Sequence, residues 1–287
     1  MRDIAVAVPG GVINAWCRPA AVGEPTAVLI HGLTGTSRWW VNVIEHLHAG
    51  LGIVAIDVRG RGGSVEAPPP FHMAELADDV ARCLDQFSID RAIIAGYSMG
   101  GWIAGVFADR HPDRVDRLVL VDGGLPLPSD PGMDAEELIG AMVGPSLARL
   151  DIVFETEDAF FDYWKAHPAL ERHWDDSMRP ALRYELRKTG DAYEVVANAE
   201  AIREGARQIT VDPATRSIGE SVEVPTHLIV VEKGTADQDG GLVPLATAEG
   251  AAAANPNLTL EYLEGLNHYT LILGAGAAQV AAAVSGD

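Results

Sequence analysis

The chain has few cysteines and no long apolar stretch. Its two cysteines, Cys17 and Cys83, form no C-x-x-C pair, so the sequence indicates neither a disulfide framework nor a thiolate zinc site. No apolar run approaches the ~20 residues that a membrane helix needs. The N-terminal apolar run is broken by proline and glycine too early for a secretory signal. We therefore expect a cytoplasmic protein with two reduced, buried cysteines.

Basic side chains are also scarce. The 287 residues hold 21 Lys and Arg against 41 Asp and Glu, which gives a formal net charge of −20. Such a charge repels nucleic acids and anionic membrane surfaces, so we expect neither as a partner. Hydrophobic residues make up 48% of the chain, enough for a globular core. The sequence leaves the oligomeric state open, a homo-oligomer included.

Strand and helix patterns alternate in the first half. Four short apolar runs are typical of strands covered on both faces, at residues 27–30, 52–56, 92–95 and 118–121. Helical patterns separate them, at residues 39–48, 73–87 and 102–108. Alternating segments at 4–8 and 12–16 predict two edge strands before the first run. This order predicts an α/β fold, a mostly parallel sheet with helices on both faces.

The pattern changes between residues 125 and 220. This segment contains no clear buried strand, and its helical stretches fall at residues 135–143, 159–166, 180–188 and 195–207. The sheet pattern then resumes with expected strands at 227–231 and 258–263. We expect residues 1–124 and 221–287 to form one core and residues 125–220 a helical cap over the carboxyl edge of the sheet. The alternative is a helical subdomain without a role in substrate choice.

Ser98 lies in a G-x-S-x-G motif. It stands between Gly96 and Gly100, after an expected strand and before an expected helix. This context predicts a nucleophile elbow, a turn so sharp that side chains at the positions of Gly96 and Gly100 would collide. The turn exposes the serine hydroxyl at the carboxyl edge of the sheet, where the dipole of the following helix favours negative charge.

A serine hydroxyl is a weak nucleophile, so it needs an imidazole base and a carboxylate that orients the imidazole. Of the nine histidines, His268 lies in the loop after the last expected strand, in a Gly-x-x-His context. Three aspartates are candidates for the carboxylate that orients the imidazole. Asp237 follows Gly234 in a Gly-x-x-Asp loop and is the expected acid; Asp239 and Asp122 are the alternatives.

Together these motifs resemble the α/β-hydrolases that carry a helical cap. The resemblance covers nearly the whole chain, from the His31-Gly32 pair through the Ser98 motif to His268. It implies that His31 shapes a loop and that the backbone N–H groups of Leu33 and Met99 form an oxyanion hole. It implies no cofactor.

The segment 57–64 resembles the Asp-x-Arg-Gly-x-Gly-x-Ser turn of the same family. Asp57 and Arg59 are expected to hold this loop by hydrogen bonds and a salt bridge. The segment is not a dinucleotide fingerprint, because G-x-G-x-x-G is absent. Metal binding is not indicated either, since His46 and His48 cannot share a helix face and no H-E-x-x-H occurs.

A nucleophilic serine sets this chain apart from the relatives of this fold that use aspartate. We expect hydrolysis of a carboxylic ester or lactone through an acyl-enzyme. The alternatives are hydrolysis of a carbon–carbon bond in a β-diketone-like ring-cleavage product, and a ligand receptor without catalysis.

The cap limits the substrate. Residues 125–220 hold 19 acidic and 10 basic side chains, which disfavours highly anionic molecules. Three cap aromatics are expected to line an apolar pocket, Phe160, Trp164 and Trp174. The predicted substrate is therefore a small to medium, fairly hydrophobic molecule.

Overall fold

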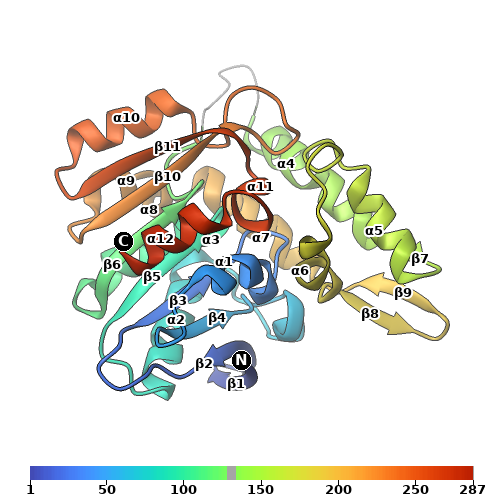
Figure 1. The fold of residues 1–287 in the computed structure, drawn as a ribbon, viewed down its shortest axis with the longest axis horizontal. Coiled ribbons are helices and arrows are strands. Elements are labelled where there is room, and N and C mark those ends of the chain that lie inside the picture. Colours follow the sequence, from blue (N-terminus) through green and yellow to red (C-terminus); the bar gives the residue numbers. More distant parts are fainter. Residues whose placement is uncertain (128–133, 287) are drawn as a thin grey trace.

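An eight-stranded sheet forms the centre of the protein (Figure 1). The computed structural model describes residues 1–127 and 134–286, so residues 128–133 of the expected cap lie outside the described part. The strands are β1 (Arg2–Val8), β2 (Gly11–Arg18), β3 (Thr26–Ile30), β4 (Gly52–Ile56), β5 (Ala92–Tyr97), β6 (Val115–Val121), β10 (Thr226–Lys233) and β11 (Leu258–Asn267).

The strand order is β1-β2-β4-β3-β5-β6-β10-β11. β2 pairs antiparallel with β1 and β4, and all other pairs in this sheet are parallel. The expected mostly parallel α/β sheet is therefore confirmed. Of the two expected edge strands, only β1 lies at the edge, because β2 is covered on both sides by β1 and β4.

Helices cover both faces of this sheet. They are α1 (Val41–His46), α2 (Met73–Gln86), α3 (Met99–Arg110), α10 (Leu245–Ala254), α11 (Thr270–Leu273) and α12 (Ala277–Ser285), with short 3-10 turns at η1 (Ser37–Trp40), η2 (Gly62–Ser64) and η3 (Pro112–Arg114). Val28 and Ile30 of β3 pack with α2 and α3, whereas Leu29 packs with α1 and α12. Because both faces are buried, the strand is apolar from Ala27 to Ile30.

The segment between β6 and β10 holds the remaining elements. They are α4 (Ala135–Leu150), β7 (Val153–Phe154), α5 (Glu157–Lys165), η4 (Asp176–Met178), α6 (Arg179–Arg183), β8 (Leu186–Thr189), β9 (Ala192–Val195), α7 (Ala199–Val211), α8 (Pro213–Arg216) and α9 (Ile218–Ser221). In the described part of the chain, no helix is both long and apolar enough to cross a bilayer.

The segment was expected to hold helices and no clear buried strand, and the structure adds short strands to those helices. β7, β9 and β8 form a small antiparallel sheet, so the helix expected at 180–188 ends at Arg183. The hairpin between β8 and β9 turns at Gly190, whose φ of +63° is a left-handed conformation that glycine adopts without strain. These strands are short, β8 is largely exposed and β9 is only partly buried, so they lack the buried apolar pattern of the central sheet.

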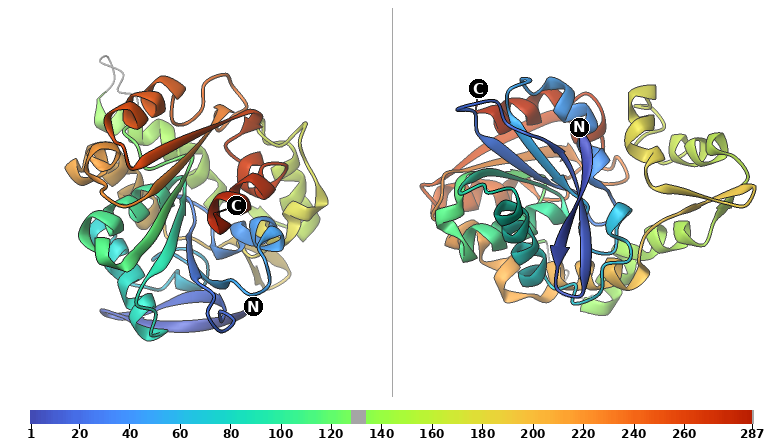
Figure 2. Two further views of the ribbon diagram at one scale, coloured as in Figure 1. Left: turned by 60° about the vertical axis from the view of Figure 1, so that its left-hand side comes forward. Right: turned by 90° about the horizontal axis from the view of Figure 1, so that it is seen from below.

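Two parts of the inserted segment differ in position. α5 and the small sheet stand away from the central sheet, which is clearest in the right-hand view of Figure 2. α7 instead packs against the body of the protein, and its Ile202 and Ala206 form a buried cluster with Ile139 and Val143 of α4. α7 therefore holds α4 over the carboxyl edge of the sheet.

Candidate active site

Ser98 stands in a sharp turn between β5 and α3. Its φ of +54° and ψ of −124° are strained for a residue with a side chain. A Cβ atom on Gly96 would lie 2.0 Å from the carbonyl oxygen of Gly100, and one on Gly100 would lie 2.1 Å from the carbonyl oxygen of Ile30. No side chain fits at either position, which explains the spacing of the motif. The Ser98 side chain lies on a cavity at the carboxyl end of β5.

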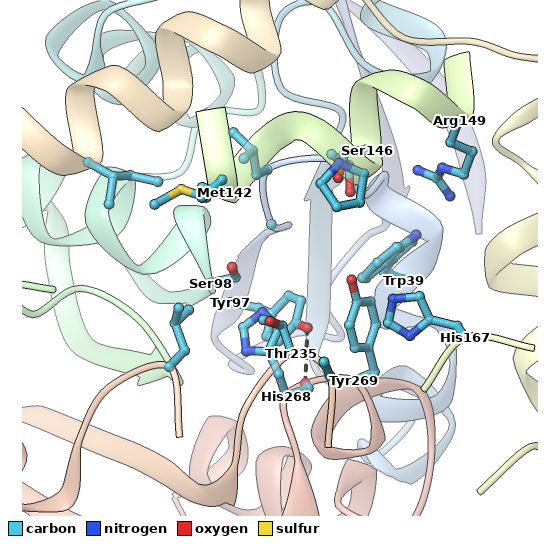
Figure 3. A pocket seen from close by; sticks show the side chains of 18 of the residues that line it. Trp39, Tyr97, Ser98, Met142, Ser146, Arg149, His167, Thr235, His268 and Tyr269 are labelled. Carbon is cyan, nitrogen blue, oxygen red and sulfur yellow. Dashed lines mark hydrogen bonds between the residues drawn. The ribbon is translucent and has the colours of Figure 1, made fainter. Parts of the chain in front are cut away.

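His268 follows β11 and lies on the same cavity (Figure 3). The hydroxyl of Tyr97 donates to the His268 carbonyl oxygen at 3.0 Å, and the two rings stack with centroids 4.8 Å apart. These contacts hold the imidazole beside the nucleophile elbow. Within the described residues, no hydrogen bond joins Ser98 to His268.

The carboxylate beside His268 is Asp122. His268 Nδ1 lies 2.6 Å from Asp122 Oδ2, and both side chains are buried. A carboxylate accepts hydrogen bonds, so Nδ1 carries the proton and the lone pair of the neutral ring lies on Nε2. Asp122 Oδ1 is buried without a partner in the described part of the chain. The His268 N–H therefore donates the side-chain hydrogen bond that this buried carboxylate accepts in the described part of the chain.

The expectation that Asp237 pairs with His268 is wrong. Asp237 Oδ1 instead accepts a hydrogen bond from Asn267 Nδ2 at 2.8 Å, which lowers the pKa of Asp237. Asp237 thus positions the neighbour of His268. Asp239 is exposed and is not the partner either.

The sheet order explains this choice. β6 lies directly beside β5, whereas β10 is one strand further from the nucleophile elbow. The loop after β11 must reach across β10 to bring His268 to Ser98, so its imidazole passes the end of β6. Asp122 stands there, and its backbone has a φ of +45°.

The N–H groups of Leu33 and Met99 are available as donors. Leu33 follows the His31-Gly32 pair on the cavity wall, and Met99 is the first residue of α3. Neither N–H donates to another group in the described part of the chain. The first N–H groups of a helix have no acceptor within the helix, so they can hold an anion. This arrangement is compatible with the expected oxyanion hole.

Arg61 ties these two residues together, a feature that the sequence analysis missed. Its guanidinium donates to the carbonyl oxygens of Leu33 (2.9 Å), Arg59 (2.8 Å) and Ala201 (2.9 Å), and it contacts the Met99 sulfur at 3.7 Å. Arg61 is buried, and burial lowers its pKa to about 9. Its hydrogen-bond partners in the described part of the chain are these carbonyl oxygens and the sulfur, with no carboxylate among them. It joins α7 to the loop of Leu33.

His31 has a structural role, as expected. Its Nδ1 donates to the Gly32 carbonyl oxygen at 2.7 Å, and its Nε2 accepts from the Val58 N–H at 3.0 Å. Burial lowers the pKa of His31 to about 4, so the ring is neutral at pH 7. Both nitrogens are occupied, which leaves none to act as a base. The described residues contain no cluster of three or more His, Cys, Asp or Glu side chains that could hold a metal ion.

The turn at 57–64 is also structural. The Asp57 carboxylate accepts from the N–H groups of Ser37 (2.6 Å) and Gly63 (2.9 Å). Arg59 forms a salt bridge with Asp79 at 2.5 Å. The expectation that Asp57 and Arg59 hold this loop is confirmed.

The cavity has a volume of about 520 Å³. Of the three aromatics expected to line it, only Trp164 does so. Phe160 is fully buried between Phe154 and Trp164, and Trp174 packs against Phe161. Phe160 and Trp174 therefore stabilise the inserted segment and do not line the cavity.

One side of the cavity is apolar and the other polar. The apolar side comes from α4, α7 and nearby loops and consists of Leu127, Leu138, Met142, Ile209 and Leu242. The polar side includes Arg149, His167 and Tyr269, which the sequence analysis did not identify. No motif marks these three residues, because they come from separate elements.

A strained serine elbow on a parallel α/β sheet, with a buried histidine–aspartate pair beside it, defines the hydrolase class of α/β proteins. The model of the family described as alpha/beta hydrolase fold matches residues 25–274. The chain belongs to this family.

Similar proteins are known from sequence and from structure. A protein of Caulobacter sp. (strain K31), provisionally named the carbamate hydrolase RutD, is 33% identical over 104 residues, which span 36% of this chain and 39% of that protein. The structure of an E-2-(acetamidomethylene)succinate hydrolase has a TM-score of 0.80 at 20% identity, over 98% of this chain and 97% of that one. A thermophilic esterase from Thermogutta terrifontis has a TM-score of 0.68 at 19% identity, over 100% and 97%. The structural matches establish the shared fold.

Proposed function

We propose that this protein is a serine hydrolase that cleaves a small to medium carboxylic ester or lactone through an acyl-enzyme. Residues 1–124 and 221–287 form its core, and residues 125–220 form its cap. The main support is that His268, held by Asp122 at 2.6 Å, lies on the same cavity as Ser98. Such a serine, imidazole and carboxylate are the parts of a catalytic triad.

In the first half of the reaction, His268 Nε2 takes the proton of the Ser98 hydroxyl while Oγ attacks the substrate carbonyl carbon. The N–H groups of Leu33 and Met99 stabilise the oxyanion. The intermediate collapses when the carbon–oxygen bond to the leaving group breaks and His268 gives its proton to the departing oxygen. Asp122 keeps the Nδ1 proton in place and stabilises the imidazolium.

In the second half, His268 takes a proton from water, and the resulting hydroxide attacks the acyl carbon. The bond to Ser98 breaks, and the serine oxygen recovers its proton from His268. The products are a carboxylic acid and a free enzyme, so no cofactor is consumed. For a lactone, the leaving oxygen stays attached to the acyl chain and the product is a hydroxy acid.

The cavity supports the size and the partly apolar character of the substrate. About 520 Å³ lies within the usual range for sites that enclose small molecules. Its apolar side can cover a hydrocarbon portion of the substrate. The negative charge of residues 125–220 opposes highly anionic molecules.

The experiment that tests this function is a substrate panel with wild-type protein and Ser98→Ala. The panel contains p-nitrophenyl esters, lactones, carbamates and dienone acids. We expect ester or lactone hydrolysis that Ser98→Ala abolishes, and labelling of Ser98 by an active-site serine probe. Turnover of dienone acids alone would favour carbon–carbon bond hydrolysis, and binding without turnover or labelling would favour a receptor.

A further inference from the structure

The polar side of the cavity forms a group of hydrogen-bond donors that the proposed reaction does not use. We infer, on the basis of the proposed function, that the substrate carries one carboxylate and that Arg149, His167 and Tyr269 bind it. We call these three residues the donor cluster. Figure 3 shows them on one side of the cavity and Ser98 and Met142 on the other.

Contacts between the side chains confirm that the donor cluster is compact. The rings of His167 and Tyr269 lie 5.0 Å apart. Trp164 joins them to the arginine, because its ring lies 5.7 Å from His167 and 5.9 Å from Tyr269, while the Arg149 guanidinium lies over it at 4.6 Å. The Trp164 Nε1–H is itself buried without a partner among the described residues.

Arg149 keeps donors for a ligand. It is buried, and its Nη1 donates to Glu185 Oε2 at 2.7 Å. The other oxygen of Glu185 accepts from Trp39 Nε1 at 2.7 Å, so Glu185 is held by two elements. The remaining N–H groups of Arg149 have no protein acceptor in the described part of the chain. A guanidinium that faces a cavity in this way is suited to a planar carboxylate.

The other two members are donors as well. His167 Nδ1 accepts from the Ala169 N–H at 3.2 Å, so the neutral ring carries its proton on Nε2. Burial and Arg149 lower the pKa of His167, which favours this neutral form. Burial raises the pKa of Tyr269 to about 12, so its hydroxyl keeps its proton. The hydroxyl has no hydrogen-bond partner within the described residues.

The ligand must therefore supply acceptors. A carboxylate does so with two oxygens, and hydrogen bonds to a charged acceptor are roughly twice as strong as neutral ones. Glu185 already balances Arg149, and the cap is negatively charged, so the cluster suits one carboxylate and not several. The inferred substrate class is an ester or lactone with a single free carboxylate, such as the half-ester of a dicarboxylic acid.

The test measures binding to Ser98→Ala protein, which cannot form the acyl-enzyme. Titration calorimetry compares the monoethyl esters of succinate, glutarate and adipate with the matching diethyl esters. We expect at least one monoethyl ester to bind about 10-fold or more tightly than its diethyl ester, because hydrogen bonds to a charged group are lost in the diester. Equal or weaker binding of every monoethyl ester would overturn the inference.

Variants of the cluster locate the effect. Arg149→Gln alone would leave Glu185 buried without its cation, so it is combined with Glu185→Gln. In the Ser98→Ala background, this double replacement should reduce the preference for the monoethyl ester over the diethyl ester to within about 2-fold. Tyr269→Phe, which creates no buried charge, should reduce the same preference about 3-fold or more. Arg179→Gln is the matched control, because Arg179 pairs with Asp158 and Asp176 at the surface. A preference that survives in both cluster variants would contradict the assignment.

The two proposals can fail separately. If wild-type protein hydrolyses no ester but Ser98→Ala binds a monoethyl ester in a manner that depends on Arg149, the carboxylate site stands and the hydrolase function falls. If wild-type protein hydrolyses diesters through Ser98 and the monoethyl esters bind no better, the function stands and the carboxylate site falls.

Discussion

His268 and Asp122 form a buried pair, with Nδ1 and Oδ2 2.6 Å apart. The carboxylate comes from the end of β6 and not from the loop after β10. Asp237, in that later loop, supports Asn267 beside the histidine. Asp122 therefore contacts the imidazole ring directly, whereas Asp237 contacts the loop that carries the ring.

Replacement of the acids should separate these roles. Asp122→Asn is expected to lower kcat on the best ester about 10⁴-fold, because the amide cannot hold the His268 proton on Nδ1. Asp237→Asn keeps the size of the side chain and should cost about 10-fold or less. Asp239→Asn serves as the exposed control. A larger loss in Asp237→Asn than in Asp122→Asn would show that the pair in this structure is not the catalytic one.

Arg61 should matter for both stability and rate. Arg61→Met leaves three carbonyl oxygens without their donor, so we expect a loss of about 3 kcal/mol or more in the free energy of unfolding. The Leu33 loop also loses its anchor, so kcat should fall while KM changes little. Urea unfolding and steady-state kinetics measure the two effects.

Arg110→Met is the control for this experiment, because Arg110 pairs with Asp78 at the surface. It should cost less than about 1 kcal/mol and leave kcat unchanged. If Arg61→Met behaves like Arg110→Met, the guanidinium does not hold the Leu33 loop.

The three aromatics of the segment between β6 and β10 should give different results. Trp164→Ala enlarges the cavity and is expected to change the order of kcat/KM values across an ester series. Phe160→Ala should cost about 3–5 kcal/mol of stability because it opens a void in this segment, with little change in that order. Trp174→Ala should also leave the order unchanged. If Phe160→Ala or Trp174→Ala changed the order of kcat/KM values and Trp164→Ala did not, the assignment of Trp164 to the cavity wall would be contradicted.

The buried, neutral His31 should make stability depend on pH. Its folded pKa of about 4 lies below the unfolded value of about 6.5, so the unfolded chain takes up the proton first as the pH falls. The contribution of neutral His31 to the free energy of unfolding is present above about pH 6.5 and is lost towards pH 4. Between pH 6.5 and 5, we expect wild-type protein to lose about 1.5 kcal/mol more than His31→Gln. If the free energies of unfolding of the two proteins changed in parallel with pH, His31 would not titrate in this way.

Much of the architecture could be predicted from local sequence. The strands β3 to β6 are apolar at nearly every position because both faces of a parallel sheet are covered. A Cβ atom on Gly96 or Gly100 would lie only 2.0 or 2.1 Å from a backbone oxygen, so both positions require glycine. The motif alone therefore predicts the elbow. Local rules failed where tertiary packing is weak, as at β8, whose short and exposed strand has no apolar pattern.

The sequence by itself determined the elbow, the histidine after the last strand and the order of strands and helices in the central sheet, because each of these features has a local residue pattern. Only the tertiary structure decided which aspartate meets His268, since Asp122 and Asp237 both follow strands and the sheet order alone brings one to the ring. The same holds for Arg61 and Arg149. The acceptors of Arg61 and the cavity that Arg149 faces are built from segments far apart in the sequence. No local sequence pattern predicts that these segments come into contact.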